Sequence, residues 1–262
     1  MLRSIGFYTF FVLIYLVTSM LGALPLGVLS EVIRILAFAI PVFIGCVYAR
    51  RDKRRREEIR GVSEPEKRLF TMKPEYIPDV FLLSFPVIFV IFIISFLTSL
   101  LLALFGVESG MEYSGDFVTL LLTSAIAPAI LEEMLFRFLP ILIIAPYSKK
   151  YAVIASALLF AVSHSDPAMI PYSLFAGAVF MIVDLGFDSV IPSFIMHFIN
   201  NALSCVLICY IDTEEKLIFY GASLLVLALG CTVPILLMGR RFLDTLKRAF
   251  VMDDAPPSCE FL

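Results

Sequence analysis

Apolar side chains fall in eight runs separated by short polar segments, and the pattern predicts a helix for each run. The runs span about 5–23, 32–49, 79–105, 117–145, 150–164, 168–184, 189–210 and 217–239. A membrane-spanning helix needs about 20 mostly apolar residues. The pattern therefore predicts an all-α, polytopic membrane helical bundle of about eight transmembrane helices. The fifth and sixth runs are short, which predicts helices that are interrupted near 163–167 or covered by protein rather than lipid.

The composition supports a membrane protein and excludes several other classes. The chain has 262 residues, of which 60% are hydrophobic and 16% are charged. Soluble domains contain about 45–50% apolar and roughly 25% charged residues, so a soluble fold would have more apolar side chain than it can bury. The same values exclude an intrinsically disordered chain, a nucleic-acid-binding module and a disulfide-stapled secreted domain. We therefore expect membrane lipids, and no nucleic acid, among the partners.

The placement of lysine and arginine predicts the orientation in the membrane. Ten of the 20 basic residues lie between Arg50 and Lys73, and loops rich in lysine and arginine remain cytoplasmic. The loop at 106–116 is acidic and is assigned to the outside. These features predict a multi-pass protein of the cell membrane with both termini in the cytoplasm.

The same charges divide the chain into regions. We expect one transmembrane domain over residues 1–248 and a disordered cytoplasmic tail over 249–262. The basic cytoplasmic loop, 50–78, mixes acidic and basic residues. It is interpreted as a solvated helical loop on an anionic leaflet, with a regulatory or lipid-binding element as the alternative.

Three charges in the fourth run are the strongest local indication of function. Glu132, Glu133 and Arg137 lie within six residues of an otherwise apolar stretch, although an ionisable group at mid-bilayer costs at least about 2.5–3.5 kcal/mol. Glu133 and Arg137 are four residues apart in the favourable order, so they share a helix face and can form an ion pair. Glu132 points about 100° away. A structural ion pair needs one glutamate, so the second predicts a functional role.

The chain has two histidines, and both fall in apolar runs. His164 ends the fifth run, and His197 lies four residues before Asn201 in the seventh. At about 1.5 Å per residue, the distances of His164, His197 and Asn201 from the predicted cytoplasmic helix ends place these residues at a depth similar to that of Glu132. A lone histidine or asparagine in a membrane is more commonly a hydrogen-bonded interior residue. A cluster is nevertheless expected, although the count does not identify which helices are neighbours.

Such a cluster suits hydrolysis by an activated water molecule. A desolvated carboxylate beside an imidazole can act as a general base, and His197 and Asn201 can donate hydrogen bonds to a developing oxyanion. The sequence contains no serine-nucleophile turn, zinc-protease helix, phosphate-binding loop or dinucleotide loop. Ser163 adjoins His164, but neighbouring residues on a helix point about 100° apart, which disfavours a Ser–His pair.

The order and spacing of these residues resemble a known family, the CAAX protease and bacteriocin-processing (CPBP, or Abi) intramembrane proteases. The resemblance covers about residues 115–205. The motifs that carry it are Glu132-Glu133-x-x-x-Arg137, Phe160-x-x-x-His164 and His197-x-x-x-Asn201. The resemblance implies an intramembrane endopeptidase of the bacterial branch, with a peptide or protein substrate that enters a cavity in the membrane. Roles in bacteriocin maturation or self-immunity are implied for that branch.

The resemblance also assigns roles to residues. It implies that Glu132 activates water with the help of His164, that His197 and Asn201 stabilise the oxyanion, and that Glu133 and Arg137 support them. Members are often described as metalloproteases, whereas the glutamate-and-water mechanism requires no cofactor. The metal-free mechanism is favoured, with zinc as the alternative on Glu132, His164 and His197.

Two other functions remain open at this stage. A non-catalytic immunity or scaffold protein of the same fold would sequester a peptide without cleaving it. A proton-coupled transporter also uses buried glutamate and histidine as a relay. Transporters commonly contain repeated halves, and the sequence shows no internal repeat.

Overall fold

A computed structural model describes residues 1–22, 28–64, 68–107, 116–164, 166–211 and 213–238, together with Asp244 and Lys247. Over these residues every regular element is helical, in eight segments that coincide with the eight apolar runs, so the all-α prediction is confirmed. A 3₁₀ turn, Pro74–Tyr76, precedes the third segment. The segments are α1 (Leu2–Gly22), α2 (Val28–Arg60), α3 (Ile77–Leu104), a composite helix from Phe117 to Ile143, α7 (Lys149–Val162), α8 (Met169–Phe187), α9 (Ile191–Tyr210) and α10 (Glu214–Met238).

Several of these helices are long and apolar enough to cross a membrane. Within the described residues there are four such candidates, at Pro74–Leu104, Met169–Phe187, Ile191–Tyr210 and Glu214–Val233. Their number supports a multi-pass membrane protein. That the chain crosses the membrane eight times and that both termini are cytoplasmic remain predictions. The tail 249–262 and most of the acidic loop 106–116 lie outside the described residues.

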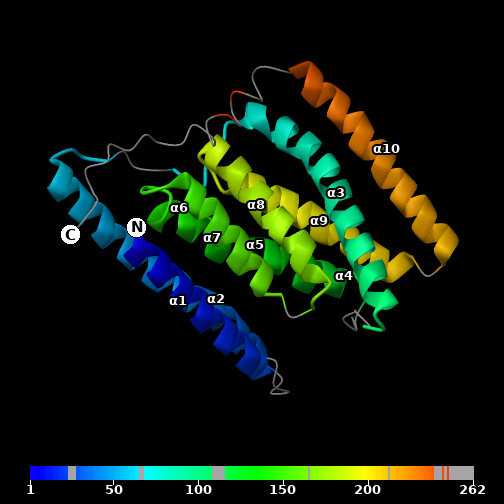
Figure 1. Ribbon diagram of the computed structural model, residues 1–262, viewed down its shortest axis with the longest axis horizontal. Coiled ribbons are helices and arrows are strands. Elements are labelled where there is room, and N and C mark those ends of the chain that lie inside the picture. Colours follow the sequence, from blue (N-terminus) through cyan, green and yellow to red (C-terminus); the bar gives the residue numbers. More distant parts are fainter. Residues whose placement is uncertain are drawn as a thin grey trace.

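The helices form a bundle with the composite helix in its interior. α1 and α2 pair along one edge, and α3 and α10 pair along the opposite edge, with the remaining helices between them (Figure 1). Leu135, Phe136 and Leu139 of the composite helix are fully buried, and they pack in one cluster with Tyr8 and Phe11 of α1. The two edge pairs therefore enclose a central layer that carries the candidate site.

The composite helix departs twice from α-helical geometry. Asp116 caps its start by accepting a hydrogen bond from the backbone N–H of Thr119 at 2.8 Å. π-helical turns interrupt the helix on both sides of residues 127–133. Such turns are rare overall, and many of those known lie at functional sites. Ser156 of α7 donates a hydrogen bond to the Phe136 carbonyl inside the second π turn, so this backbone group is satisfied. The parts are α4 (Phe117–Leu120), a π turn (Leu121–Ile126), α5 (Ala127–Glu133), a π turn (Met134–Phe138) and α6 (Leu139–Ile143).

Close contact between α7 and α8 depends on a glycine. A Cβ at Gly177 would lie 2.9 Å from Cα of Ala157, closer than real Cβ atoms come. Glycine therefore lets the two backbones approach, and α7 ends just before His164. The position of that histidine is set by the α7–α8 contact.

The connection between α8 and α9 is held by three hydrogen bonds. Oδ1 of buried Asp184 accepts the backbone N–H of Ser193 at 2.9 Å. The Leu69 carbonyl accepts from Ser189 Oγ at 3.1 Å and from the Val190 N–H at 2.9 Å. The first turn of α9 is thus anchored to α8 and to the segment that follows α2. His197 lies one turn further along the same helix.

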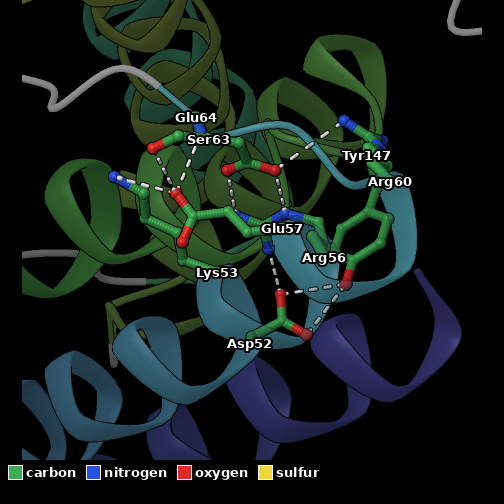
Figure 2. A network of polar contacts seen from close by, with 8 residues as sticks. All are labelled: Asp52, Lys53, Arg56, Glu57, Arg60, Ser63, Glu64 and Tyr147. Carbon is green, nitrogen blue, oxygen red and sulfur yellow. Dashed lines mark hydrogen bonds and ion pairs between the residues drawn. The ribbon is translucent and has the colours of Figure 1, made fainter.

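α2 continues beyond its apolar part into a charged end that is fixed to the rest of the protein. Arg56 donates hydrogen bonds to both oxygens of Glu64 at 2.7 and 2.8 Å, and it pairs with Asp52 (Figure 2). Tyr147, in the connection between α6 and α7, donates to Asp52 at 2.8 Å. This network joins the end of α2 to two connecting segments.

Candidate active site

A buried ion pair forms the base of the site. Nε of Arg137 lies 3.2 Å from Oε2 of Glu133, and both side chains are 0% exposed. The guanidinium carbon lies 4.3 Å from the ring centre of Phe160 and 5.5 Å from that of Phe180, which are cation–π distances. Glu133 and Arg137 thus form the pair that their spacing predicts. An unpaired charge at this depth would be strongly destabilising.

Both glutamates approach the same imidazole. Nδ1 of His197 lies 2.6 Å from Oε1 of Glu133, and Nε2 lies 3.8 Å from Oε2 of Glu132. The rings of Phe160 and Phe180 lie 5.9 and 6.0 Å from the imidazole ring. A carboxylate bonded to one ring nitrogen fixes the orientation of the ring and determines what the other nitrogen faces. Glu133 therefore aims Nε2 of His197 toward Glu132.

The two adjacent glutamates have different environments. The Glu133 side chain is fully buried, whereas that of Glu132 is 19% exposed and lines a cavity. Because Arg137 pairs with Glu133, the Glu132 carboxylate keeps its charge available to a group in the cavity. Glu133 is therefore the glutamate that the ion pair uses, and Glu132 remains outside it.

His164 is oriented by the backbone of its own helix. Its Nδ1 lies 2.9 Å from the carbonyl oxygen of Phe160, and its ring meets that of Phe160 edge-on, with the ring centres 4.9 Å apart. A neutral imidazole that donates from Nδ1 keeps Nε2 as an acceptor. His164 therefore offers one free ring nitrogen to the cavity that it lines.

Asn201 joins α9 to the first π turn. Its Nδ2 donates a hydrogen bond to the Ser124 carbonyl at 3.1 Å. Its Oδ1 accepts from Asn200 Nδ2 at 3.0 Å. The amide is held by both of its polar atoms, and one of its two N–H groups remains for another partner.

The four residues assigned to catalysis share one cavity. Its volume is about 410 Å³, and Glu132, His164, His197 and Asn201 all line it. Apolar side chains of α3 and α10 form part of its wall, including those of Phe92 and Leu224. The direct contact of Glu132 with a histidine is to His197. Among the described residues no contact joins Glu132 to His164, the histidine expected to assist it.

The donor atoms do not form a metal site. Within the described ranges, no group of three or more His, Cys, Asp and Glu side chains is arranged to hold a metal ion. Nδ1 of His197 is bonded to Glu133, and Nδ1 of His164 is bonded to a backbone carbonyl. These bonds occupy one nitrogen of each ring and leave Nε2 as the atom that could bind a metal, but the alternative zinc ligands, Glu132, His164 and His197, are not arranged as such a group in the part of the chain that the structure describes.

Sequence reasoning missed Asp184 and Phe180, which complete the surroundings of the ion pair. Asp184 is 0% exposed, and its Oδ2 has no hydrogen-bond partner among the described residues. Asp184 could have been found from the sequence, because it is an ionisable residue at the end of the apolar run 168–184. An ionisable residue within an apolar run was the criterion that identified Glu132. Phe180 carried no such signal, since one more phenylalanine in an apolar helix is unexceptional.

The fold and the cavity define a helical membrane protein with a buried glutamate–histidine site. Residues 114–203 match a family model described as Rce1-like, type II CAAX prenyl endopeptidase Rce1-like. No curated protein and no solved structure matches the chain. The match supports an Rce1-like domain in the middle of the chain, and the description of that family is of a protease. All four cavity residues assigned to catalysis lie inside the matched segment.

Proposed function

We propose that the protein is an intramembrane endopeptidase that hydrolyses a peptide bond with a water molecule activated by Glu132. The observation that carries the proposal is the shared cavity inside the Rce1-like segment, which Glu132 lines together with His164, His197 and Asn201. A partly desolvated carboxylate that is not neutralised by an arginine is suited to take a proton from water.

The roles of the other residues follow from their contacts. Glu133, itself paired with Arg137, holds His197 by Nδ1, and Nε2 faces the cavity. The free N–H of Asn201 donates to the oxyanion of the tetrahedral intermediate, and His197 donates from Nε2 in the form of the ring that carries a proton on both nitrogens. His164 uses its free ring nitrogen to move the proton between the water and the leaving amine.

The proposed substrate is a peptide segment brought into the membrane by an apolar group. The cavity combines apolar walls from α3 and α10 with the polar cluster, which suits a chain that is apolar beside its scissile bond. The matched family is described as acting on prenylated CAAX sequences, and we extend this substrate class to the present chain. Bacteriocin maturation and self-immunity are the proposed physiological roles.

The test compares purified wild-type protein and Glu132→Gln in nanodiscs on quenched fluorescent peptides that end in a farnesylated CAAX sequence. Membrane fractions of cells carrying either protein are compared for peptide fragments. Cleavage that is lost in Glu132→Gln and kept in Glu58→Gln, an exposed glutamate on α2, is the expected result. Full cleavage by Glu132→Gln contradicts the proposal. Peptide binding without cleavage by the wild type would instead favour a sequestering protein.

A further inference from the structure

α2 presents two different faces along a single uninterrupted helix. The buried face consists of small residues at intervals of four, namely Ala37, Pro41, Gly45 and Ala49. A Cβ at Gly45 would lie 2.6 Å from Cδ2 of Leu139, so α2 and α6 are in close contact there. The side of α2 that faces the bundle is therefore fixed by packing.

The opposite face is exposed and changes from apolar to basic. From Leu36 onward its large apolar side chains are 36–71% exposed, and they are Leu36, Ile40, Phe43, Ile44 and Val47. Immediately beyond them lie four exposed arginines, which at about 100° per residue spread over an arc of about 140° on this side of the helix. They are Arg50, Arg51, Arg54 and Arg55, here called the arginine stripe.

The arginine stripe is not used by the polar network at the end of α2. Arg56 is buried against Asp52 and Glu64, Lys53 lies 3.8 Å from Glu57, and Arg60 lies 3.7 Å from Glu64 (Figure 2). Over the residues that the structure describes, none of the four stripe arginines has an ion pair or a side-chain hydrogen bond. The network faces the protein, so the stripe faces outward.

The position of the stripe matches the boundary of a membrane. With a rise of 1.5 Å per residue, Arg50 to Arg55 lie about 5–12 Å beyond Val47 along the helix axis. The polar headgroup region of a bilayer is about 5–8 Å thick on each side of the hydrocarbon core. If the exposed apolar face contacts lipid tails, Arg50 and Arg51 are level with the phosphates. Arg54 and Arg55 start about 10–12 Å beyond Val47, and their long flexible side chains reach back toward the same layer. The acidic residues on this face, Glu57 and Glu58, lie further out, about 15–17 Å beyond Val47, and Glu57 is paired with Lys53.

We propose that the arginine stripe binds the phosphate groups of anionic phospholipids in the leaflet at this end of α2. A guanidinium group can donate two parallel hydrogen bonds to a phosphate, and it is weakly hydrated, so it gives up water readily. Four such groups without protein partners select anionic over zwitterionic headgroups. This inference is independent of the proposed proteolysis and of which side of the membrane α2 ends on.

The experiment measures lipid binding by the full chain in detergent. Thermal unfolding and native mass spectrometry are followed while phosphatidylglycerol or phosphatidylcholine is added. We expect phosphatidylglycerol to bind and stabilise the wild type more than phosphatidylcholine does. Substituting all four arginines with glutamine should lower the apparent phosphatidylglycerol affinity at least about tenfold, since each juxtamembrane charge is worth roughly fivefold.

Two further variants separate lipid binding from folding. Arg60→Gln removes one exposed charge about 20 Å beyond Val47 and should change the affinity by less than about threefold, because the attraction to the surface falls off over about 8–10 Å. Substituting the stripe with lysine keeps the charge and should retain the preference for phosphatidylglycerol. The glutamine variant should unfold at the wild-type temperature before lipid is added, which shows that it folds. An unchanged lipid preference in the glutamine variant, or equal stabilisation of the wild type by both lipids, would overturn the proposal.

Discussion

Nδ1 of His197 lies 2.6 Å from Oε1 of Glu133, and this contact links helices that are 64 residues apart in the chain. The same carboxylate pairs with Arg137 through its other oxygen. Glu133 therefore serves both the stability of the bundle and the orientation of the imidazole. Glu132 lacks both of these contacts, so substitutions at the two adjacent glutamates are expected to have different effects.

Glu133→Gln should destabilise the protein. The substitution leaves Arg137 buried without its counter-charge, and breaking one partner of a buried pair costs about 3–5 kcal/mol. Thermal unfolding in detergent measures the loss. The double variant Glu133→Gln/Arg137→Met should recover part of the stability, because both charges are then removed. A single variant as stable as the wild type would contradict the importance of this pair.

Glu132→Gln should remove activity and leave the stability nearly unchanged. Its carboxylate is partly exposed to the cavity, and its contact with His197 is long at 3.8 Å. Loss of a general base lowers kcat by about a hundredfold or more. Unfolding temperature and peptide cleavage are measured on the same preparation. If the unfolding temperature falls as far as in Glu133→Gln, the two glutamates do not have separate roles.

Asp184→Ala should loosen the start of α9. The substitution leaves the buried N–H of Ser193 without its acceptor, at a cost of about 1–3 kcal/mol. Asp184→Asn retains an oxygen at the same place and should be less destabilising. Hydrogen exchange at the first turn of α9 reports the difference. Equal protection in the alanine and asparagine variants would show that the hydrogen bond contributes little.

Gly177→Ala should separate α7 from α8. The added Cβ meets the Ala157 backbone at 2.9 Å, and the backbone cannot rotate away as a side chain can. Overpacking of this kind costs about 1–3 kcal/mol. Gly230→Ala is the matched control, because a Cβ there has no atom within 4 Å. Thermal unfolding of the two variants should differ clearly, and equal unfolding temperatures would contradict the close contact.

Acid should weaken the network at the end of α2. The hydrogen bonds from Arg56, together with the charges of nearby basic groups, lower the pKa of Glu64. A lowered pKa means that Glu64 stabilises the fold above its ordinary pKa, near 4.3, and that this contribution is lost as the pH falls toward the lower folded value. The group is partly exposed, so the contribution is about 1 kcal/mol or less.

Hydrogen exchange of residues 56–64, corrected for intrinsic rates, measures this effect between pH 6 and pH 3. Protection in the wild type should fall across this interval. Glu64→Gln should be less protected at pH 6 and nearly independent of pH, whereas Glu58→Gln should behave as the wild type. A wild-type profile that stays flat would exclude the contribution of Glu64.

Local features of the fold could be predicted from the sequence. The eight helical segments follow the apolar runs, because each run is bounded by polar or charged residues. The Glu133–Arg137 pair follows from a spacing of four on one helix. These features depend on residues that are close together in the sequence, so the sequence alone is enough to predict them.

Contacts between helices could not be predicted in the same way. Glu133 contacts His197, whereas His164 bonds to the Phe160 carbonyl. These contacts depend on which helices are neighbours and on how each helix is rotated about its axis. The depth of each residue along its helix axis indicated that the site residues lie at a similar level in the membrane, but it carried no information on how the helices are rotated. The small residues of α2 and the buried Arg56 likewise acquire meaning only when α6 and Tyr147 are seen against them.

The two π turns that flank α5 make the site sensitive to the length of the backbone. Each π turn accommodates one more residue per hydrogen-bonded turn than an α-helix does, so it rotates everything beyond it. The short stretch with Glu132 and Glu133 is therefore turned relative to both ends of its helix. Loss of one residue from a π turn would restore α-helical winding there, whereas loss of one residue from α5 would rotate one end of the helix by about 100° relative to the other. Removing one amino acid can thus silence the cavity while every side chain that lines it remains present.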